Sequence, residues 1–499
     1  MPPARTFSWE EHHMTIQSGL WFDPTKLLIG GEWRSGAGGR AIAVENPSTG
    51  ENIGQIAEGT ATDVEAAVAA AEAALDGEWG AMTATERGRI LVRLSRLVTE
   101  RAETLAHLES NDVGKPLGQA RNDAVALARY FEFYGGAADK ITGETIPYQQ
   151  GTTVLTLREP HGVTAHIIPW NYPMQIMGRS VGAALAMGNA CVLKPAEDAS
   201  LSALAVAALA EEAGLPAGVL NIVTGYGHEV GAALSAHPRV HHVSFTGSVG
   251  TGRRIQAAAS ENVIPVTLEL GGKSPHIVFD DCDLDAALPT LVGACVQAAG
   301  QTCSAASRVL VQRGVYDEVK RRMAEVYAGL VVGPASADHD LGPLVSGKQK
   351  AIVAGYIAQG KAELTIAGEG TIHADAPAGG HYVAPILFAD VDPDHRLAQE
   401  EIFGPVQVLI PFEDEADAIR IANGTDYGLV AGVWTENGAR QMRLARKLHV
   451  GQVFINNYGA GGGVELPFGG VGKSGHGREK GFEALYGFSR LKTISIKHG

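Results

Sequence analysis

Residues 243–252, Val243-Ser-Phe-Thr-Gly-Ser-Val-Gly-Thr-Gly252, join a short apolar run to a turn that holds three glycines. The pattern predicts a strand that ends near Phe245, followed by a tight turn that opens a helix. Free N–H groups at the start of such a helix can bind a pyrophosphate. An ordinary strand-to-helix turn would have the same pattern, so the residues alone leave both interpretations open. In either case this stretch is the repeating unit of a parallel α/β fold.

The same alternation extends on both sides of this stretch, from about residue 160 to residue 280. Alanine-rich helical segments such as 201–213 separate short apolar runs at 163–169, 190–193, 219–223, 242–245 and 266–268. Continuous apolar strands separated by helices predict a parallel sheet that is covered on both faces. Ligands of such a sheet bind at the carboxyl ends of its strands. A second glycine turn, Gly225-Tyr-Gly227, follows one of these strands.

A second α/β alternation begins after residue 271. Its strand candidates are 308–312, 406–412, 429–434 and 452–457, and its helix candidates are 316–330 and 416–422. Near the N-terminus, two helices are expected behind capping boxes, one made by Thr62 and Glu65 and one by Thr83 and Glu86. The strand-like segments 152–157 and 491–496 fit neither domain, and we expect them to pair in a small accessory sheet.

Length and composition limit the class of protein. The 499 residues correspond to about three domains. A net charge of −15 disfavours nucleic acid and anionic membranes as partners, and no apolar run is long enough to predict a membrane span. Four cysteines without a Cys-x-x-Cys pair favour a reducing, cytoplasmic location. The N-terminal segment lacks the apolar core of a secretory signal, and Met14 is a second candidate for the start.

Three residues are candidates for acyl chemistry. Cys303 lies among small residues in Gly-Gln-Thr-Cys-Ser-Ala and is either a nucleophile or a buried apolar residue. Glu269 ends a predicted strand in an apolar frame that would raise its pKa, which suits a general base, although a paired carboxylate is equally compatible. Asn171 lies between Pro169 and Pro173, where a rigid amide could donate to an oxyanion or cap the turn.

Other patterns in the sequence are weaker evidence for a binding or catalytic site. Lys194 and Glu197 follow a predicted strand and could bracket a ribose or form a surface pair. The string Gly470-Val-Gly-Lys-Ser-Gly475 matches a dinucleotide fingerprint but lacks a surrounding strand-helix unit, and neither Gly-Lys-Ser triplet fits a P-loop. No group of His, Cys and carboxylate residues has the spacing of a metal site, so no metal is expected.

Taken together and in this order, these segments resemble the aldehyde dehydrogenase superfamily from about Leu28 to the C-terminus. The motifs that carry the resemblance are Ile168-Pro-Trp-Asn-Tyr-Pro173, Lys194-Pro-Ala-Glu197, Phe245-Thr-Gly-Ser248 with Gly252, Leu268-Glu-Leu-Gly-Gly272, Gly300-Gln-Thr-Cys303, Glu400-Glu-Ile-Phe-Gly-Pro405 and Pro467-Phe-Gly-Gly470. The resemblance implies a Rossmann-like parallel-sheet cofactor domain (20–143 and 163–270), a second α/β catalytic domain (271–483) and a small β oligomerisation element (144–162 and 484–499).

The resemblance also implies NAD-dependent oxidation of an aldehyde to the carboxylic acid. Cys303 would attack the aldehyde, Asn171 and the Cys303 backbone N–H would hold the oxyanion, and Glu269 would activate the water that hydrolyses the thioester. Relatives that acylate coenzyme A usually lack this glutamate, so Glu269 favours hydrolysis. The alternatives are a non-enzymatic relative of the same fold, which would typically lack the cysteine or the glutamate, and a thiol esterase as a side activity.

Cofactor contacts follow from the resemblance residue by residue. They are Ile168, Trp170, Lys194, Glu197, Gly227, Phe245, Gly247, Ser248, Gly252, Leu270, Glu401 and Phe403. A carboxylate at Glu197 can accept both ribose hydroxyls and would repel a 2′-phosphate, so NAD is expected over NADP.

Substrate contacts are expected from Tyr172, Arg179 and Phe468. Many relatives carry Trp-Lys where this chain has Arg179-Ser180, and an arginine at the first position meets the distal carboxylate in relatives similar to succinate-semialdehyde dehydrogenases. Arg179 is therefore a candidate for recognising a carboxylate or another polar end. Those relatives add a second arginine where this chain has Gln297, which argues against the assignment. Tyr172, Met177 and Phe468 predict a partly apolar tunnel for aromatic or medium aliphatic aldehydes. The accessory strands resemble the family's oligomerisation element, so the resemblance implies a homodimer or homotetramer.

Overall fold

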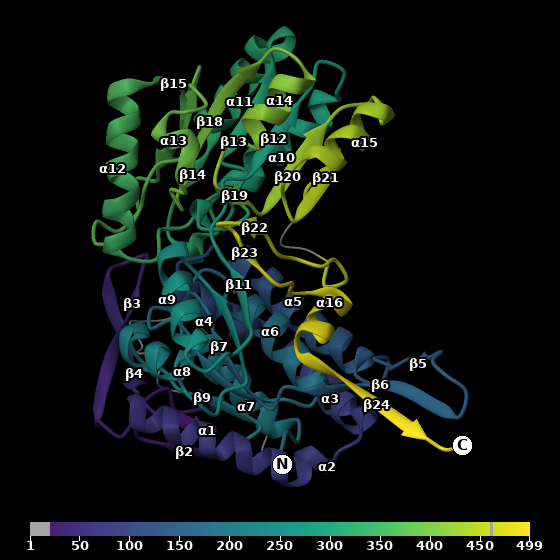
Figure 1. Cartoon of the computed structure of the whole chain (residues 1–499). Coiled ribbons are helices and arrows are strands. Elements are labelled where there is room, and N and C mark those ends of the chain that lie inside the picture. Colours follow the sequence, from purple (N-terminus) through teal and green to yellow (C-terminus); the bar gives the residue numbers. More distant parts are fainter. Residues whose placement is uncertain (1–19, 460–462) are drawn as a thin grey trace.

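The computed structural model describes residues 20–459 and 463–499. Figure 1 shows two α/β domains stacked on each other, with a narrow sheet that projects to one side. The lower domain contains an eight-stranded sheet in the order β2-β1-β9-β8-β7-β10-β11-β23. Its strands are β1 Leu27–Ile29, β2 Glu32–Arg34, β7 Val163–Ile167, β8 Ala190–Lys194, β9 Leu220–Ile222, β10 His242–Thr246, β11 Val266–Glu269 and β23 Gly475–His476.

Five adjacent strands of this sheet are parallel, in the order β9, β8, β7, β10 and β11. Strands β1 and β23 flank them in antiparallel pairing. Along β8, Cys191 and Leu193 enter one apolar cluster, whereas Ala190 and Val192 enter another. Because successive strand residues point to opposite faces, a sheet that is covered on both sides needs apolar residues at every position. This is the physical reason for the continuous apolar runs in the sequence.

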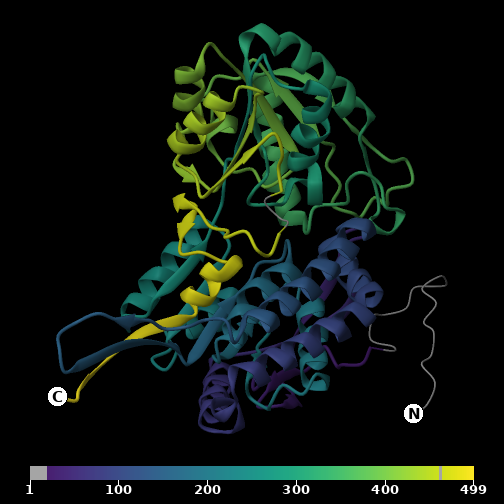
Figure 2. The same cartoon turned by 90° about the vertical axis from the view of Figure 1, so that its right-hand side faces the viewer.

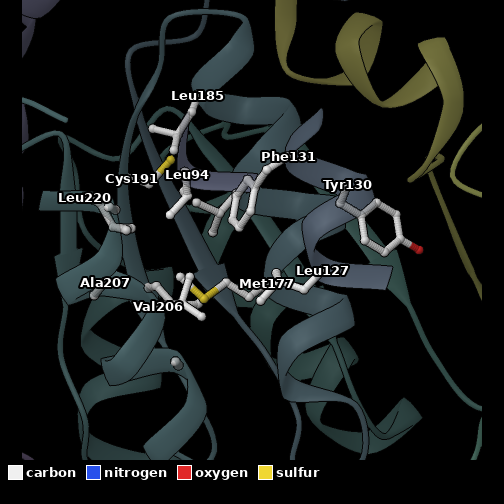
Figure 3. Close-up of a cluster of buried hydrophobic side chains, with 14 of the residues drawn as sticks. Leu94, Leu127, Tyr130, Phe131, Met177, Leu185, Cys191, Val206, Ala207 and Leu220 are labelled. Carbon is white, nitrogen blue, oxygen red and sulfur yellow. The ribbon is translucent and has the colours of Figure 1, made fainter. Parts of the chain in front are cut away.

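Two sets of helices cover the two faces. One cluster holds side chains of α3 Ala84–Glu100, α4 Ala102–Val113, α5 Leu117–Ala137, α6 Pro173–Ala186 and α7 Leu201–Glu212. The other cluster holds side chains of α1 Ala61–Asp76, α8 Ala232–Ser235 and α9 Val249–Ser260. Figure 3 shows part of the first cluster, in which Met177 lies among Leu127 and Val206 while the ring of Tyr130 points away from them.

The upper domain contains a seven-stranded sheet in the order β15-β17-β18-β13-β12-β20-β21, parallel except for β15. Its strands are β12 Pro275–Val278, β13 Arg308–Gln312, β15 Thr365–Glu369, β17 Ile386–Ala389, β18 Val406–Phe412, β20 Val430–Trp434 and β21 Gln452–Ile455. Its helices are α10 Leu284–Val296, α11 Tyr316–Gly329, α12 Gly347–Glu363, α13 Arg396–Gln399, α14 Glu415–Ala422 and α15 Gly438–Lys447. Strands β12, β15 and β17 were not predicted.

The third sheet joins segments that are far apart in the sequence. Strand β24 Ser489–Lys497 pairs antiparallel with β6 Thr152–Pro160, which also pairs with β5 Thr145–Ile146. This confirms the predicted pairing of the two strand-like segments. Figure 2 shows that this sheet extends away from the body of the molecule and carries the C-terminus near its tip.

The remaining elements are short. They are the hairpin β3 Arg40–Asn46 with β4 Glu51–Glu58, the pairs β14 Val331–Val332 with β16 Thr371–Ile372 and β19 Tyr427–Gly428 with β22 Val471–Gly472, and the helices α2 Glu78–Ala81 and α16 Gly481–Gly487. Within residues 20–459 and 463–499, no helix is both long and apolar enough to cross a bilayer, and no group of His, Cys, Asp and Glu side chains could hold a metal ion.

One predicted helix start is wrong. The predicted capping box of Thr62 and Glu65 lies inside α1, which begins at Ala61. The actual cap is Thr60, whose extended backbone precedes the helix and whose N–H donates to Asp63 at 2.9 Å. An aspartate at the third helical position can close a capping box as a glutamate does. Two overlapping capping boxes, one with Asp63 and one with Glu65, therefore fit the sequence. The box of Thr83 and Glu86 is confirmed.

A buried group of charges fixes the first turn of α6. Lys115 donates to Glu109 at 2.6 Å and pairs with Asp123, and all three side chains are almost completely buried. The carboxylates bind α6 directly, because Glu109 accepts from the Met174 N–H at 3.3 Å and Asp123 accepts from the Gln175 amide at 2.6 Å. The loop that precedes α6 carries Asn171, so this group holds that loop against α4 and α5.

We predict that Lys115→Met destabilises the protein strongly, because it leaves two carboxylates buried without a cation. Breaking a buried pair costs about 3–5 kcal/mol, which corresponds to a fall of at least about 5 °C in the unfolding midpoint. Thermal denaturation followed by circular dichroism measures the change. The control is Lys140→Met, since the Lys140 side chain is 60% exposed. Equal midpoints for the two variants would contradict the assigned role of the group.

Candidate active site

A cavity of about 740 Å³ is lined by the carboxyl ends of β10 and β11, by the loop that follows β7 and by a loop of the second domain. Strands β7, β10 and β11 are parallel, with Ile167 beside Phe245 and Thr246 beside Glu269. Their carboxyl ends therefore lie at one edge of the sheet, where ligands of such sheets bind. Cys303, Glu269 and Asn171 all line this cavity.

Cys303 lies in the loop between α10 and β13. The loop has an unusual backbone, because Ala298, Ala299 and Gly300 have φ values of 48°, 54° and 75°. At Gly300 a Cβ would lie 2.2 Å from the Gly404 carbonyl oxygen, so this position requires glycine. Burial raises the pKa of the Cys303 thiol to about 12, and the Arg179 guanidinium opposes this shift. The resting cysteine is therefore a neutral thiol that needs a base to become a nucleophile.

Glu269 ends β11 and is 1% exposed. Neither of its carboxyl oxygens has a hydrogen-bond partner among the described residues. Burial raises the pKa of Glu269 well above its ordinary value; the Glu479 carboxylate adds to the shift and Arg179 opposes it. A desolvated carboxyl of this kind agrees with the expected apolar frame and suits a general base that works near neutral pH.

Asn171 lies in the loop between β7 and α6, and Pro173 is the first residue of α6. Its amide nitrogen donates to the Gln301 carbonyl at 2.9 Å, and its amide oxygen has no partner among the described residues. The amide is thus fixed against the loop of Cys303, while one of its two N–H bonds remains available to an oxyanion in the cavity.

Six of the residues expected to contact the cofactor also line this cavity, together with Gly271. They are Trp170, Gly247, Ser248, Leu270, Glu401 and Phe403. The Ser248 hydroxyl caps α9 by accepting from the Thr251 N–H at 3.3 Å. Glu401 accepts from the Gly272 N–H at 2.9 Å, and burial raises its pKa to about 7. Trp170 meets Phe403 edge to face, with 5.3 Å between ring centroids.

Six of the expected cofactor residues lie outside the lining of this cavity. They are Ile168, Lys194, Glu197, Gly227, Phe245 and Gly252. Lys194 ends β8, which is adjacent to β7, and its ammonium pairs with Glu197 at 3.2 Å. The Glu197 side chain is 32% exposed. The pair therefore lies along the same sheet edge, where Glu197 is partly accessible to a ligand that extends beyond the cavity and Lys194 is buried behind it.

The expected substrate residues Tyr172, Arg179 and Phe468 line the cavity. The guanidinium of Arg179 already has partners within the protein. It forms an ion pair with the buried Glu479 and donates to the Thr246 hydroxyl at 3.2 Å. Met177 was wrongly assigned to the tunnel, since it is fully buried in the helical cluster of the first domain. On α6, a helix buried nearly all round, spacing alone did not show which residues face the cavity.

Sequence reasoning missed two residues near the catalytic group. Lys480 lines the cavity, and Glu479 neutralises Arg179 behind it. Both follow Pro467-Phe-Gly-Gly470 by about ten residues, in a segment that has no periodic pattern. The adjacent charges Arg478, Glu479 and Lys480 in a glycine-rich segment were an available clue, but Arg179, the ion-pair partner of Glu479, lies 300 residues earlier in the chain.

Comparison with known proteins identifies the family. A model described as the aldehyde dehydrogenase family matches residues 33–494. Hydroxyisobutyraldehyde dehydrogenase of Mycolicibacterium austroafricanum is 43% identical over 475 residues, which are 95% of this chain and 94% of the relative.

Solved structures agree with this assignment. One from Burkholderia cenocepacia is 65% identical, with a TM-score of 0.94 over 95% of this chain and all of that chain. Betaine aldehyde dehydrogenase of Staphylococcus aureus, solved with NAD+, is 36% identical, with a TM-score of 0.92 over 95% of each chain. These matches confirm the predicted resemblance, the α/β fold class and the enzyme class. The chain therefore belongs to the aldehyde dehydrogenase family.

Proposed function

We propose that this enzyme oxidises an aldehyde to its carboxylic acid with NAD, through a thioester on Cys303 that Glu269 helps to hydrolyse. Family membership supplies the reaction class, NAD-dependent aldehyde oxidation. The observation that carries the mechanism is that a cysteine, an amide donor and a desolvated carboxyl line one cavity. Neither a non-enzymatic role nor a separate esterase role explains why these groups share the cavity with the residues expected to bind a dinucleotide.

The residues expected to contact the cofactor fit NAD. The capped N-terminus of α9 offers free N–H groups to a pyrophosphate, and the carboxylates of Glu197 and Glu401 can accept ribose hydroxyls. At Gly271 a Cβ would lie 2.2 Å from a Glu401 oxygen, so glycine allows this carboxylate to reach the strand end. A bound NAD would supply a hydride acceptor for the carbon attached to the Cys303 sulfur.

Cys303 begins the reaction as a thiol, and its proton is released to solvent water as the sulfur attacks the aldehyde carbon. The carbonyl oxygen then becomes an oxyanion, which accepts hydrogen bonds from the Asn171 amide and the Cys303 backbone N–H. Because Asn171 is fixed to the carbonyl of Gln301, two residues before Cys303, donor and nucleophile move as one unit. Such pre-arranged donors stabilise the oxyanion without reorganisation.

Glu269 removes a proton from water once the thioester has formed. The water oxygen bonds to the thioester carbon, the carbon–sulfur bond breaks, and the Cys303 sulfur recovers a proton. The carboxylic acid is then released. The raised pKa of Glu269 makes it a stronger base than an ordinary carboxylate, which is the property that hydrolysis requires.

The substrate end of the cavity is partly apolar. Tyr130, Tyr172, Ile176 and Phe468 line it, together with Gln119 and Gln175. This lining supports aliphatic or aromatic aldehydes, including small hydroxylated ones such as the aldehyde for which the relative of Mycolicibacterium austroafricanum is named. The pairing of Arg179 with Glu479 removes the main argument for a dicarboxylate semialdehyde.

We also propose that the enzyme assembles as a homodimer or homotetramer through the sheet β5-β6-β24. Strand β24 is an edge strand of nine residues, and it exposes Leu491 by 56% and Ile496 by 48%. An exposed apolar edge strand is a surface that pairs readily with another chain. A cytoplasmic location is supported by the four cysteines, all of which are free thiols.

Cys303→Ala is expected to lower the rate of NADH formation by more than about 1,000-fold, because the nucleophile is lost. Glu269→Gln is expected to give one burst of NADH per active site and then a slow steady state, since hydrolysis becomes limiting. Stopped-flow ultraviolet absorbance with NAD and no coenzyme A measures both. Cys282→Ala, at a partly exposed cysteine outside the cavity, is the control. Full turnover by Cys303→Ala would refute the mechanism.

Glu197→Ala is expected to shift cofactor preference towards NADP. Removing the carboxylate ends its repulsion of a 2′-phosphate and its hydrogen bonds to the ribose, so kcat/KM for NADP relative to NAD should rise about 10-fold. Initial rates with each cofactor at a saturating aldehyde concentration give the ratio. Glu212→Ala, at an exposed glutamate at the end of α7, is the control. An unchanged ratio would remove Glu197 from the cofactor site.

The double variant Leu491→Glu/Ile496→Glu is expected to reduce the mass measured by light scattering to that of a smaller assembly. Two charges on the apolar edge would have to be buried at the interface, which is unfavourable. Ile366→Glu introduces a charge at another exposed apolar position, which is 44% exposed, and should leave the mass unchanged. An unchanged mass for the double variant would place the interface elsewhere.

A further inference from the structure

We propose that Tyr458 is a positioning residue for the oxyanion, because its hydroxyl fixes the turn that carries Cys303 and so sets the direction of the Cys303 backbone N–H. The inference rests on the proposed function and deepens it, since it names the group of the second domain that holds the oxyanion donor in place. It depends on the hydrogen bonds of the turn and on the side chains that hold the Tyr458 ring.

Cys303 is the second residue of a tight turn. The Ala305 N–H donates to the Thr302 carbonyl at 3.0 Å, so residues 302–305 form a β-turn. The N–H of the second residue takes no part in the hydrogen bond that closes such a turn. The Cys303 N–H is therefore available to the cavity that Cys303 lines, and its direction depends on how the whole turn is oriented.

Side chains of both domains hold this turn, one at each end. The Asn171 amide, from the first domain, donates to the Gln301 carbonyl at 2.9 Å. The Tyr458 hydroxyl, from the second domain, donates to the Ser304 carbonyl. The two bonds fix the peptide group before the turn and a peptide group within it. Without the Tyr458 bond only the Asn171 bond remains, and the turn can rotate about that end.

The Tyr458 ring is itself held by the core of the second domain. Its centroid lies 4.5 Å from that of His276 in β12 and 5.5 Å from that of Phe454 in β21. His276 is fully buried, and its Nδ1 accepts from the Trp434 indole N–H in β20 at 3.1 Å. Strands β12, β20 and β21 are neighbours in the second sheet (Figure 1), so the sheet fixes the place of the hydroxyl.

Both rings keep the protonation state that this arrangement needs. Burial lowers the pKa of His276 to about 3, so its ring stays neutral and continues to accept from Trp434. Burial raises the pKa of the Tyr458 phenol above its ordinary value, and the nearby Cys303 sulfur adds to the shift. The phenol thus keeps its proton and donates it to the Ser304 carbonyl. A role for Tyr458 as the base that deprotonates Cys303 is disfavoured for the same reason.

The experiment compares two reactions of the Cys303 sulfur in the cofactor-free enzyme. With 4-nitrophenyl acetate the sulfur attacks the ester carbonyl, an oxyanion forms and collapses, 4-nitrophenolate leaves and a thioester remains. With iodoacetamide the sulfur attacks a saturated carbon, a carbon–sulfur bond forms and iodide leaves without any oxyanion. In both reactions the thiol proton passes to solvent water. A displaced oxyanion donor therefore slows only the first reaction.

Tyr458→Phe removes the hydroxyl and keeps the ring against His276. The initial release of 4-nitrophenolate, followed by absorbance, is expected to become at least about 10-fold slower, because a displaced donor stabilises the oxyanion poorly. Labelling of Cys303 by iodoacetamide, followed by mass spectrometry of the peptides, should change by less than about 2-fold, since it depends on the thiol alone.

The matched control is Tyr382→Phe. The buried Tyr382 hydroxyl also donates to a backbone carbonyl, that of Ser48 at 2.7 Å, but Tyr382 does not line the cavity. Both reactions should keep their wild-type rates in this variant. The unfolding midpoints of the two variants should agree, because each loses one bond from a phenol to a carbonyl.

A second variant tests the support that His276 gives to Tyr458. His276→Asn keeps an amide oxygen as acceptor for the Trp434 indole N–H but removes the ring that lies against Tyr458. The ratio of acylation rate to alkylation rate is expected to fall about 3-fold, in the same direction as in Tyr458→Phe. The double variant should be no slower than Tyr458→Phe, because both changes act through one hydrogen bond. An unchanged ratio in His276→Asn would refute the role of His276.

Two results for Tyr458→Phe would overturn the inference. Equal slowing of both reactions would mean that the hydroxyl controls the thiol or the access to it, not the oxyanion donor. An unchanged acylation rate would mean that the Ser304 bond does not set the direction of the Cys303 N–H.

The same measurements separate this inference from the proposed function. Slow acylation in Tyr458→Phe, with no NADH from any aldehyde in the wild type, would refute the proposed function and leave the positioning role standing. NADH formation by the wild type, with normal acylation in Tyr458→Phe, would support the proposed function and refute the positioning role.

Discussion

The chain between β11 and β12 passes the second domain at a distance that only glycine permits. At Gly272 a Cβ would lie 2.2 Å from the Cys303 carbonyl oxygen, and at Gly271 it would lie 2.2 Å from a Glu401 oxygen. The Gly272 contact is with a backbone atom, so a side chain at this position would push the loop of Cys303 away, whereas the Gly271 contact is with the end of the Glu401 side chain. The Gly272 N–H also donates to Glu401 at 2.9 Å. This contact sets Glu269 of one domain beside Cys303 of the other, and the chemistry of the site depends on it.

Desolvation is the second constraint on the site. It raises the pKa of Glu269, Cys303 and Glu401 together, because burial disfavours the charged form of each group. Other charged groups around the cavity are held in pairs, such as Arg179 with Glu479 and Lys115 with two carboxylates. Paired charges cost less to bury than free ions. The same pairs place cations against the aromatic rings of the substrate end.

Much of the fold could be predicted from the sequence, because buried strands and helices produce apolar patterns within short segments. Strands β13 and β18 begin and end where the apolar runs predicted, and α11 ends within one residue of its predicted end. Strand β12 was missed because Pro275 and His276 interrupt its apolar character, although it is an interior strand of the second sheet. The start of α1 was misplaced because Thr60 and Thr62 both fit a cap, and only the backbone angles separate them.

By itself the sequence determined the two α/β domains, the family and the three residues proposed for the chemistry, because each follows from a short segment whose periodicity or motif is local. The tertiary structure alone decided which charges are paired. Arg179 and Glu479 lie 300 residues apart, and Met177, two residues before Arg179, points into the core instead of the cavity. Spacing along a helix gives the face of a side chain but not its partner, since the partner depends on how distant segments pack.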